Sequence, residues 1–318
     1  MSWFPFVCLG SGLLFGCLNP PKGIVSLIDK IVNMALMLLM MFIGINVGVN
    51  DNVMSNLPRI GFNCALICLS AIFGSVLLTV VLEKTVVPLD QLISRATRSG
   101  GKEDAAGIPS AEETSGGSSL LWMIPASICA GIVIGYLCLD ASSEAIRSKL
   151  LYGTLVVLYT GVGVGMGSNK SVFRYLKDLG LKVVLLALAV LFGSIGGGVL
   201  AGMIAGVPLS ISLVAASGMG YYSMTGAFMT QNLGAEAGIY GFMINVMRDF
   251  FTVLLLPVLI RISKGSPSAS GAAGNMDTML VPIVKLQGQE IGLVAMVVGV
   301  LTSLSVPFLQ PLLLSLVQ

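Results

Sequence analysis

The stretch IGFNCALICLSAIFGSVLLTVVL, residues 60–82, contains no Asp, Glu, Lys or Arg. A helix that crosses the hydrocarbon core of a bilayer needs about 20 mostly apolar residues, and this stretch is long enough. Further windows free of these four residue types lie at 1–21, 31–50, 114–139, 150–169, 183–235 and 291–318. A segment at 237–260 has a similar length but carries Arg248 and Asp249 near its middle. The pattern predicts an all-α polytopic membrane protein.

Composition narrows the class further. The chain has 318 residues, is 55% hydrophobic and 10% charged, and has a mean hydropathy of +0.95. Its net charge of +2, with no dense basic run, argues against binding to nucleic acid. Histidine is absent and no cysteines form a C-x-x-C pair, which argues against the common metal sites and imidazole catalysis. We therefore expect no enzyme, no catalytic residues, no cofactor and no metal.

The long window at 183–235 cannot be a single membrane helix. Its second part, 209–230, is rich in glycine and hydroxyl residues and is predicted to re-enter or break. With that assignment there are about eight spans, and most Lys and Arg residues fall on the cytoplasmic side, as the positive-inside rule requires. Both termini are then on the outer side of the membrane. Broken or re-entrant segments are expected near 215–230 and 275–286.

Three sequence matches indicate an internal repeat. Gly12 and Gly16 match Gly131 and Gly135 at an offset of 119 residues, and Phe73-Gly74-Ser75 matches Phe192-Gly193-Ser194 at the same offset. The segment 44–52 matches 161–169 at an offset of 117. Because each copy would hold three spans, the second copy enters from the opposite face. Such an inverted repeat is typical of secondary transporters.

The repeat suggests a division of the chain into four parts. We predict a first three-helix repeat at 1–82 and a flexible cytoplasmic linker, rich in charge, Gly and Ser, at 83–119. The second, inverted repeat is expected at 120–206. The C-terminal helices, with their broken or re-entrant segments, make up 207–318.

Ionisable groups at membrane depth are costly and are therefore candidates for the site. Asp51 lies at the end of the second predicted span. It follows Asn46 and Asn50, which lie one helical turn apart on one face. Arg248 and Asp249 are adjacent and need partners on other helices, and Arg248 suits the more structural role because its charge is permanent. Asp277 opens a segment after a Gly/Ser/Ala linker. Each has a structural alternative. Asp51 could be an acid at the membrane interface, Arg248 and Asp249 could belong to an ion network between helices, and Asp277 could cap a short helix.

The segment from Ala216 to Gly226 contributes candidates of another kind. It contains Gly218, Gly220, Tyr222 and Ser223, which combine backbone freedom, hydroxyl groups and an aromatic ring. Irregular backbone at membrane depth is tolerated where it is buried in protein or lines a cavity. We expect a break that lines the substrate site, with a tight packing crossover as the alternative.

Four motifs in order resemble the LysO-type lysine exporter family of bacterial inner membranes. They are Gly44–Asn52, Ala216–Gly226, Asn245-Val246-Met247-Arg248-Asp249 and Met276–Pro282. The resemblance implies export of L-lysine and its analogues. This chain departs from the family pattern in three ways: Asp249 stands where Glu is common, Gly274-Asn275 replaces Thr-Ser, and Val298 stands where His often occurs.

A lysine exporter needs acids for the two ammonium groups and donors for the carboxylate. Asp51 and Asp277 are the candidate acids, and backbone N–H groups near Gly218 and Gly220 are the candidate donors. An ammonium favours the charged form of a buried aspartate, so lysine arrival would expel a proton. The expected partners are L-lysine, protons and the lipid bilayer, and a homo-oligomer is left open. The alternative is a cation/proton antiporter, such as one for Na⁺, on a similar scaffold.

Overall fold

The computed structural model describes part of the chain, and all of the elements in that part are helical. The described residues are 4–18, 20–49, 51–86, 89, 126–127, 129–137, 150, 153–154, 156–161, 163–164, 182–276 and 278–317. The longer helices are α1 (Phe4–Cys17), α2 (Lys22–Gly48), α3 (Asp51–Thr85), α9 (Lys182–Ile204), α12 (Ala235–Ile262) and α15 (Gln289–Val317). The shorter ones are α10 (Leu209–Ala216), α11 (Tyr222–Leu233), α13 (Ser266–Gly271), the 3₁₀ helix η3 (Ala272–Met276) and α14 (Leu280–Gln287).

Four helices within these residues are long and apolar enough to cross a membrane. They are Asn56–Thr85, Lys182–Ile204, Ala235–Ile262 and Glu290–Val317. This confirms a multi-pass helical membrane protein. The eight-span count stays a prediction, and the predicted spans at 114–139 and 150–169 lie partly outside the described residues.

The chain forms two compact units. Unit 1 comprises Met1–Pro58, Ser119–Lys170 and Thr230–Ile239, and unit 2 comprises Arg59–Ser118, Ser171–Met229 and Tyr240–Gln318. Each unit therefore takes helices from both halves of the predicted repeat.

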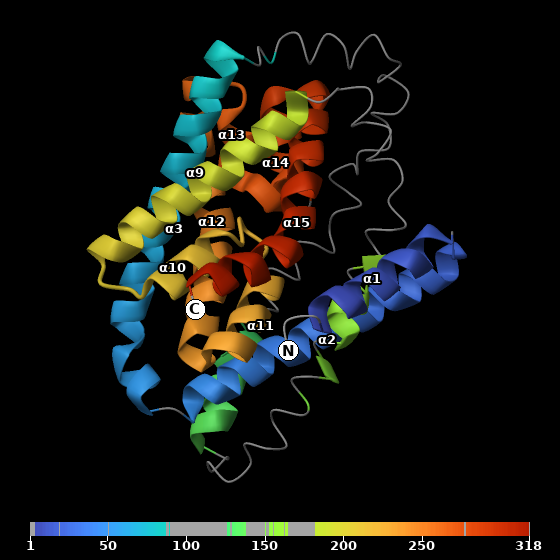
Figure 1. Cartoon of the computed structure of the whole chain (residues 1–318), viewed down its shortest axis with the longest axis vertical. Helices are drawn as coiled ribbons and strands as arrows, with labels where there is room; N and C mark the ends of the chain where they lie inside the picture. The colour runs from blue at the N-terminus through green and yellow to red at the C-terminus, as the bar shows by residue number, and fades with distance from the viewer. Residues whose placement is uncertain are drawn as a thin grey trace. The chain divides into compact units, whose positions relative to one another are not determined.

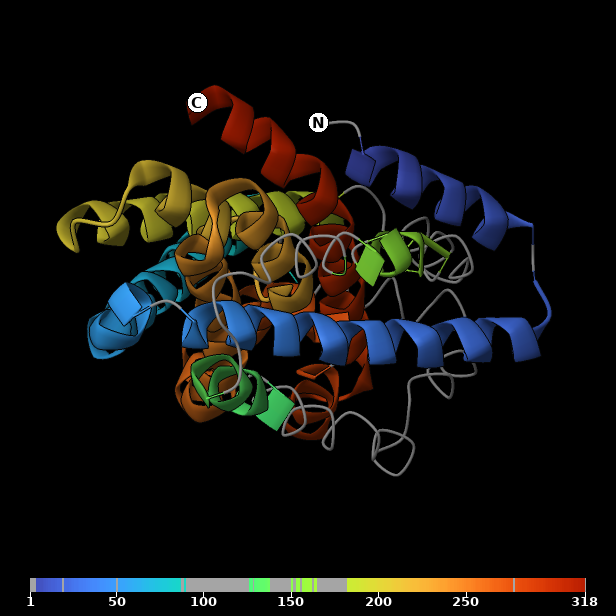
Figure 2. The ribbon, with the colours of Figure 1, turned by 90° about the horizontal axis from the view of Figure 1, so that it is seen from below.

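Within unit 1, close backbone approaches pair the two halves of the chain. A Cβ added at Gly12 would collide with the backbone of Thr160 and Val164. One added at Gly131 would collide with the backbone of Met41 and Ile45. Glycine thus allows the helices to touch, as is common in membrane proteins. The helix that carries Met41 and Ile45, α2, is long and unbroken (Figure 2).

Within unit 2, α9 crosses α3 at two glycines (Figure 1). A Cβ at Gly74 would meet the backbone of Gly193, and a Cβ at Gly193 would meet the backbone of Gly74. Ser70 Oγ also donates a hydrogen bond to Gly197 O across this crossing, at 2.8 Å. The two backbones are therefore in direct contact.

Two interrupted helices meet in the same unit. The α10 helix ends at Ala216 and α11 begins at Tyr222, with Met219 (φ 49°) and Gly220 (φ 97°) between them. The second interruption follows α13, where Ala272 has φ 45°. The two meet directly, because Ala273 N–H donates to Met219 O at 2.9 Å. The predicted breaks are present, although the second begins at Ala272, before the predicted residue 275.

Candidate functional site

The two interruptions, residues 217–221 and residues 272–276 with Thr278, define what we call the helix crossing. The side chain of Asp249, on α12, lies against it and is only 5% exposed. Asp249 Oδ2 accepts a hydrogen bond from Thr278 Oγ1 at 2.9 Å. Cβ atoms added at Gly274 and Gly220 would lie 2.6 and 3.5 Å from Asp249 Oδ1. The two glycines therefore make room for a carboxylate between the breaks.

Asn245 lies one turn before Asp249 on α12, and its side chain forms hydrogen bonds with the backbone before and within the first break. Its Oδ1 accepts from Gly220 N–H at 2.7 Å, and its Nδ2 donates to Ala215 O at 3.0 Å and Gly241 O at 2.7 Å. Gly218 N–H donates to Ala215 O at 3.2 Å. The N–H groups of Gly218 and Gly220 are thus engaged by protein oxygens, and the binding of a substrate carboxylate near them stays a prediction.

Arg248 is 2% exposed and donates hydrogen bonds to four neutral oxygens. Its Nε donates to Ser270 O at 2.8 Å and one terminal nitrogen to Ser194 Oγ at 2.7 Å. The other terminal nitrogen donates to Ser75 Oγ at 2.9 Å and Ala269 O at 3.1 Å. The two carbonyls end α13, where the helix dipole favours a cation. These bonds give Arg248 a structural setting.

Two buried amides also lie beside the breaks. Gln310 on α15 is 1% exposed, and its Nε2 donates to Thr225 Oγ1 at 2.7 Å. Asn275 Nδ2 donates to Ser268 O at 2.6 Å. Within the described part of the chain, the Oε1 of Gln310 and the Oδ1 of Asn275 accept no hydrogen bond. Each amide therefore offers a buried acceptor.

Thr225 and Asn245 converge on one point of the first break. The hydroxyl of Thr225 and the amide of Asn245 both lie within 3 Å of the position that a Cβ of Gly218 would occupy. Gln310 is thereby linked through Thr225 to the neighbourhood of Asn245. Sequence reasoning did not select these three as site residues, and Thr225 and Asn245 lay within motifs already noted.

Tyr222 and Ser223 begin α11. The ring of Tyr222 packs edge-on against Phe242, with centroids 5.8 Å apart and planes at 81°. Ser223 is buried. Both residues adjoin the first break, and their part in lining a substrate site stays a prediction.

The described part of the structure does not test the other predicted site residues. Asp51, Asn46 and Asn50 belong to unit 1. Asn50 and the side chains of Asn46 and Asp51 lie outside the described residues, as does Asp277, the neighbour of Thr278 in the chain. Their roles stay predictions.

Comparisons with known proteins agree on one family. The family model described as "Lysine exporter LysO" matches residues 6–100 and 126–314. Lysine exporter LysO of Escherichia coli is 26% identical over 302 residues, covering 93% of this chain and 94% of that protein. A putative lysine exporter of Haemophilus influenzae is 27% identical over 185 residues, covering 58% of this chain and 92% of that protein. No solved structure matches.

Proposed function

We propose that this chain, which belongs to the lysine exporter LysO family, exports L-lysine and its analogues across the bacterial inner membrane in exchange for protons. The names of the two relatives, both lysine exporters, support lysine as the substrate. The observation that supports an exchange mechanism is the buried carboxylate of Asp249 at the helix crossing.

A buried carboxylate is expensive to maintain, which makes its position informative. Arg248 is next to Asp249 in the chain, yet its hydrogen bonds go to Ser75, Ser194 and the end of α13. Thr278 orients one carboxylate oxygen, while the absence of a side chain at Gly220 and Gly274 lets the other oxygen lie close to the backbone of both breaks. We propose that this carboxylate binds and releases a cation, either a proton or an ammonium group of the substrate.

Competition between these two cations gives exchange. When the ammonium group approaches, it favours the charged carboxylate and the proton leaves. When the amino acid departs, the carboxylate takes up a proton again. Moving one positive charge outward against an inside-negative potential costs about 2.3 kcal/mol per 100 mV, and one returning proton offsets this electrical cost.

Other polar groups complete the proposed site. The acceptor oxygens of Gln310 and Asn275 suit the hydrogens of an ammonium group. Asp277, the neighbour of Thr278, and Asp51 are retained as candidate acids on the sequence argument. This assigns Asp249, which sequence reasoning grouped with Arg248, the central place.

We also propose that the scaffold is an inverted repeat. In its support, the approach of Gly12 to Thr160 has a counterpart 119 residues away, that of Gly131 to Met41. In unit 2 the glycine contact of α3 with α9, Gly74 with Gly193, joins residues at the same offset. A two-fold relation between three-helix copies explains both pairs of contacts. The predicted placement of both termini outside depends on the distribution of Lys and Arg residues.

Transport by purified protein in proteoliposomes tests the proposal. We expect an imposed proton gradient to drive accumulation of labelled lysine by the wild type, and Asp249→Asn to abolish it. Glu236→Gln is the matched control, because Glu236 is an exposed acid on the same helix and should be dispensable. Proton-driven Na⁺ movement without lysine movement would overturn the proposal in favour of a cation antiporter.

A further inference from the structure

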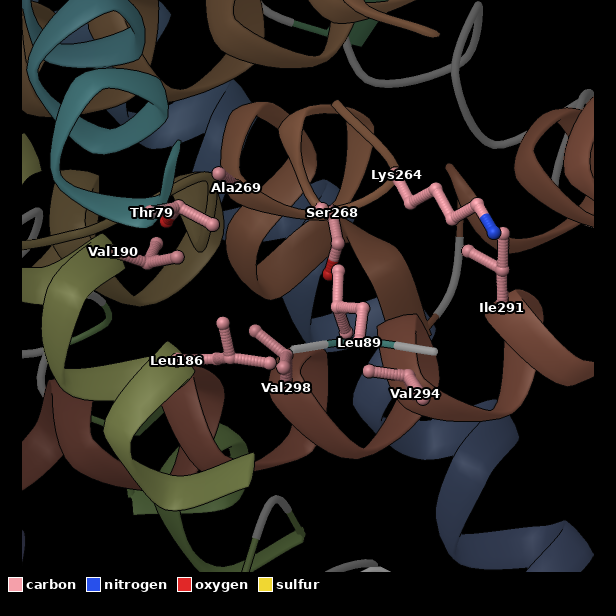
Figure 3. A pocket seen from close by; sticks show the side chains of 11 residues that line it. Thr79, Leu89, Leu186, Val190, Lys264, Ser268, Ala269, Ile291, Val294 and Val298 are labelled. Atoms are coloured by element: carbon pink, nitrogen blue, oxygen red, sulfur yellow. The ribbon is translucent and has the colours of Figure 1, made fainter. Parts of the chain in front are cut away.

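A small cavity in unit 2 lies apart from the helix crossing. It is bounded by α3, α9, the start of α13 and α15 (Figure 3). Its volume is about 10 Å³, which is close to the minimum that holds one water molecule. The cavity is far too small for an amino acid. Most of its lining is apolar, and Thr79, Ser268 and Lys264 supply the polar groups.

Two buried oxygens close to this cavity accept no protein hydrogen bond among the described residues. They are Thr79 Oγ1, on a side chain that is 2% exposed, and Glu83 Oε2. A Cβ built on Gly265, which lines the cavity, would lie 3.2 Å from both Glu83 Oε2 and Thr79 Cγ2. Buried polar atoms are costly unless a partner satisfies them. Water is the partner that the cavity has room for.

The polar groups continue along α3 in one direction. Ser75, Thr79 and Glu83 are spaced by four residues and therefore share one face of the helix. Ser75 Oγ donates to Val190 O at 3.0 Å, and Val190 lines the cavity. This face leads from the C-terminal end of α3, where Glu83 lies, to the surroundings of Arg248.

In the other direction the groups lead to the proposed site. Ser268 lines the cavity, and its carbonyl and hydroxyl oxygens accept from Asn275 Nδ2 at 2.6 and 3.2 Å. Asn275 directly follows Gly274, which adjoins Asp249. Polar groups are thus available from Glu83 through Thr79, Ser268 and Asn275 to the helix crossing.

We propose that this row, which we call the Thr79 path, is a hydrated route by which protons reach Asp249. The inference deepens the proposed function and rests on it. A proton passes between neighbouring waters and hydroxyl oxygens, and one proton enters or leaves the path for each one that Asp249 gains or loses. Most of the cavity wall at Thr79 is apolar, so the hydroxyl groups of Thr79 and Ser268 are needed to hold water there. Glu83 marks the end of the path that faces away from the crossing.

Thr79→Val tests the path because valine keeps the shape of threonine and removes its hydroxyl. We expect proton-coupled lysine transport to slow by about tenfold, the cost of one lost buried hydrogen bond, while the dissociation constant for lysine stays unchanged. Thr85→Val, on an exposed turn of the same helix, should transport like the wild type. A normal rate in Thr79→Val would overturn the path and leave the proposed function standing.

A second measurement does not depend on transport. In a background without native cysteines, Thr79→Cys should react with Ag⁺ supplied in water, because the path admits water and small cations. Leu78→Cys, on the neighbouring position, is the control: Leu78 is 39% exposed on an apolar helix and should face lipid. An unreactive Thr79→Cys would show that the cavity is a closed structural void and would overturn the path. If Thr79→Cys reacts but the wild type does not exchange lysine for protons, the proposed function fails instead.

Discussion

Ser75 and Ser194 accept hydrogen bonds from the same guanidinium, that of Arg248, at 2.9 and 2.7 Å. The two serines occupy equivalent positions in the matching triplets Phe73-Gly74-Ser75 and Phe192-Gly193-Ser194. The Arg248 side chain of α12 thus connects α3 to α9, and the two serines that it contacts are at equivalent positions of the predicted repeat. These bonds fix the position of α12 along its axis relative to α3 and α9. They thereby also fix the position of Asp249 at the helix crossing.

The shared guanidinium predicts matched effects on stability. Ser75→Ala and Ser194→Ala should each lower the free energy of unfolding by about 1 kcal/mol or more, and by similar amounts. Arg248→Met should cost more, about 2–5 kcal/mol, because several buried oxygens lose their donor at once. Thermal unfolding in detergent measures this. Ser315→Ala, an exposed serine on α15, should have no effect, and a mild Arg248→Met would contradict the structural role.

Gly274→Ala should impair transport more than it impairs folding. The added Cβ would lie 2.6 Å from Asp249 Oδ1, so the carboxylate must move from its place between the breaks. Lysine transport by the folded variant should fall by about tenfold or more, since small misplacements in a site are costly. At Gly61 the nearest atom is the tip of Met243 at 3.9 Å, so Gly61→Ala is the control. Equal transport by the two variants would argue against a site at Gly274.

The close contact between Gly74 of α3 and Gly193 of α9 predicts that alanine at either position has the same effect. In both Gly74→Ala and Gly193→Ala, the new methyl group meets backbone that cannot rotate away. Each should therefore lower the yield of folded protein in the membrane, and the two should do so to a similar degree. Gly196→Ala on the same helix meets nothing within 4 Å, and should be neutral or stabilising by up to about 1 kcal/mol. Tolerance of alanine at both glycines would rule out the close crossing.

Gln310→Leu tests the acceptor that this amide presents. Its loss should raise the lysine concentration for half-maximal transport by about tenfold, because an ammonium group loses one buried partner. Gln310→Glu keeps an acceptor of the same length and should retain more affinity. A transport assay over a range of lysine concentrations separates affinity from maximal rate. If the Gln310→Leu substitution changes only the maximal rate of transport, Gln310 does not contact lysine.

Sequence reasoning succeeded where a local pattern decides the structure. The glycine-rich segment after Ala216 breaks a helix because Met219 and Gly220 adopt positive φ. It was less accurate where charges interrupt an apolar window without ending the helix. The α2 helix begins at Lys22, although the charge-free window begins at residue 31. Likewise α3 continues past Glu83, which the window placed in the linker.

The partners of the site residues were beyond sequence reasoning. Nothing local shows that the N–H of Gly220 is taken by Asn245, a residue 25 positions away. The same holds for Gln310 and Thr225, which are 85 positions apart. Such contacts depend on how the helices pack, and only the three-dimensional structure brings Asp249 to the meeting point of two breaks.

Proton release on lysine binding is the most direct test of the exchange claim. Purified protein in weakly buffered detergent solution is mixed with lysine, and the change in pH is recorded against the amount of lysine bound. The wild type and Glu236→Gln should release a proton as lysine binds, and any lysine that Asp249→Asn binds should be bound without proton release. Proton release from Asp249→Asn equal to that of the wild type would contradict the exchange claim.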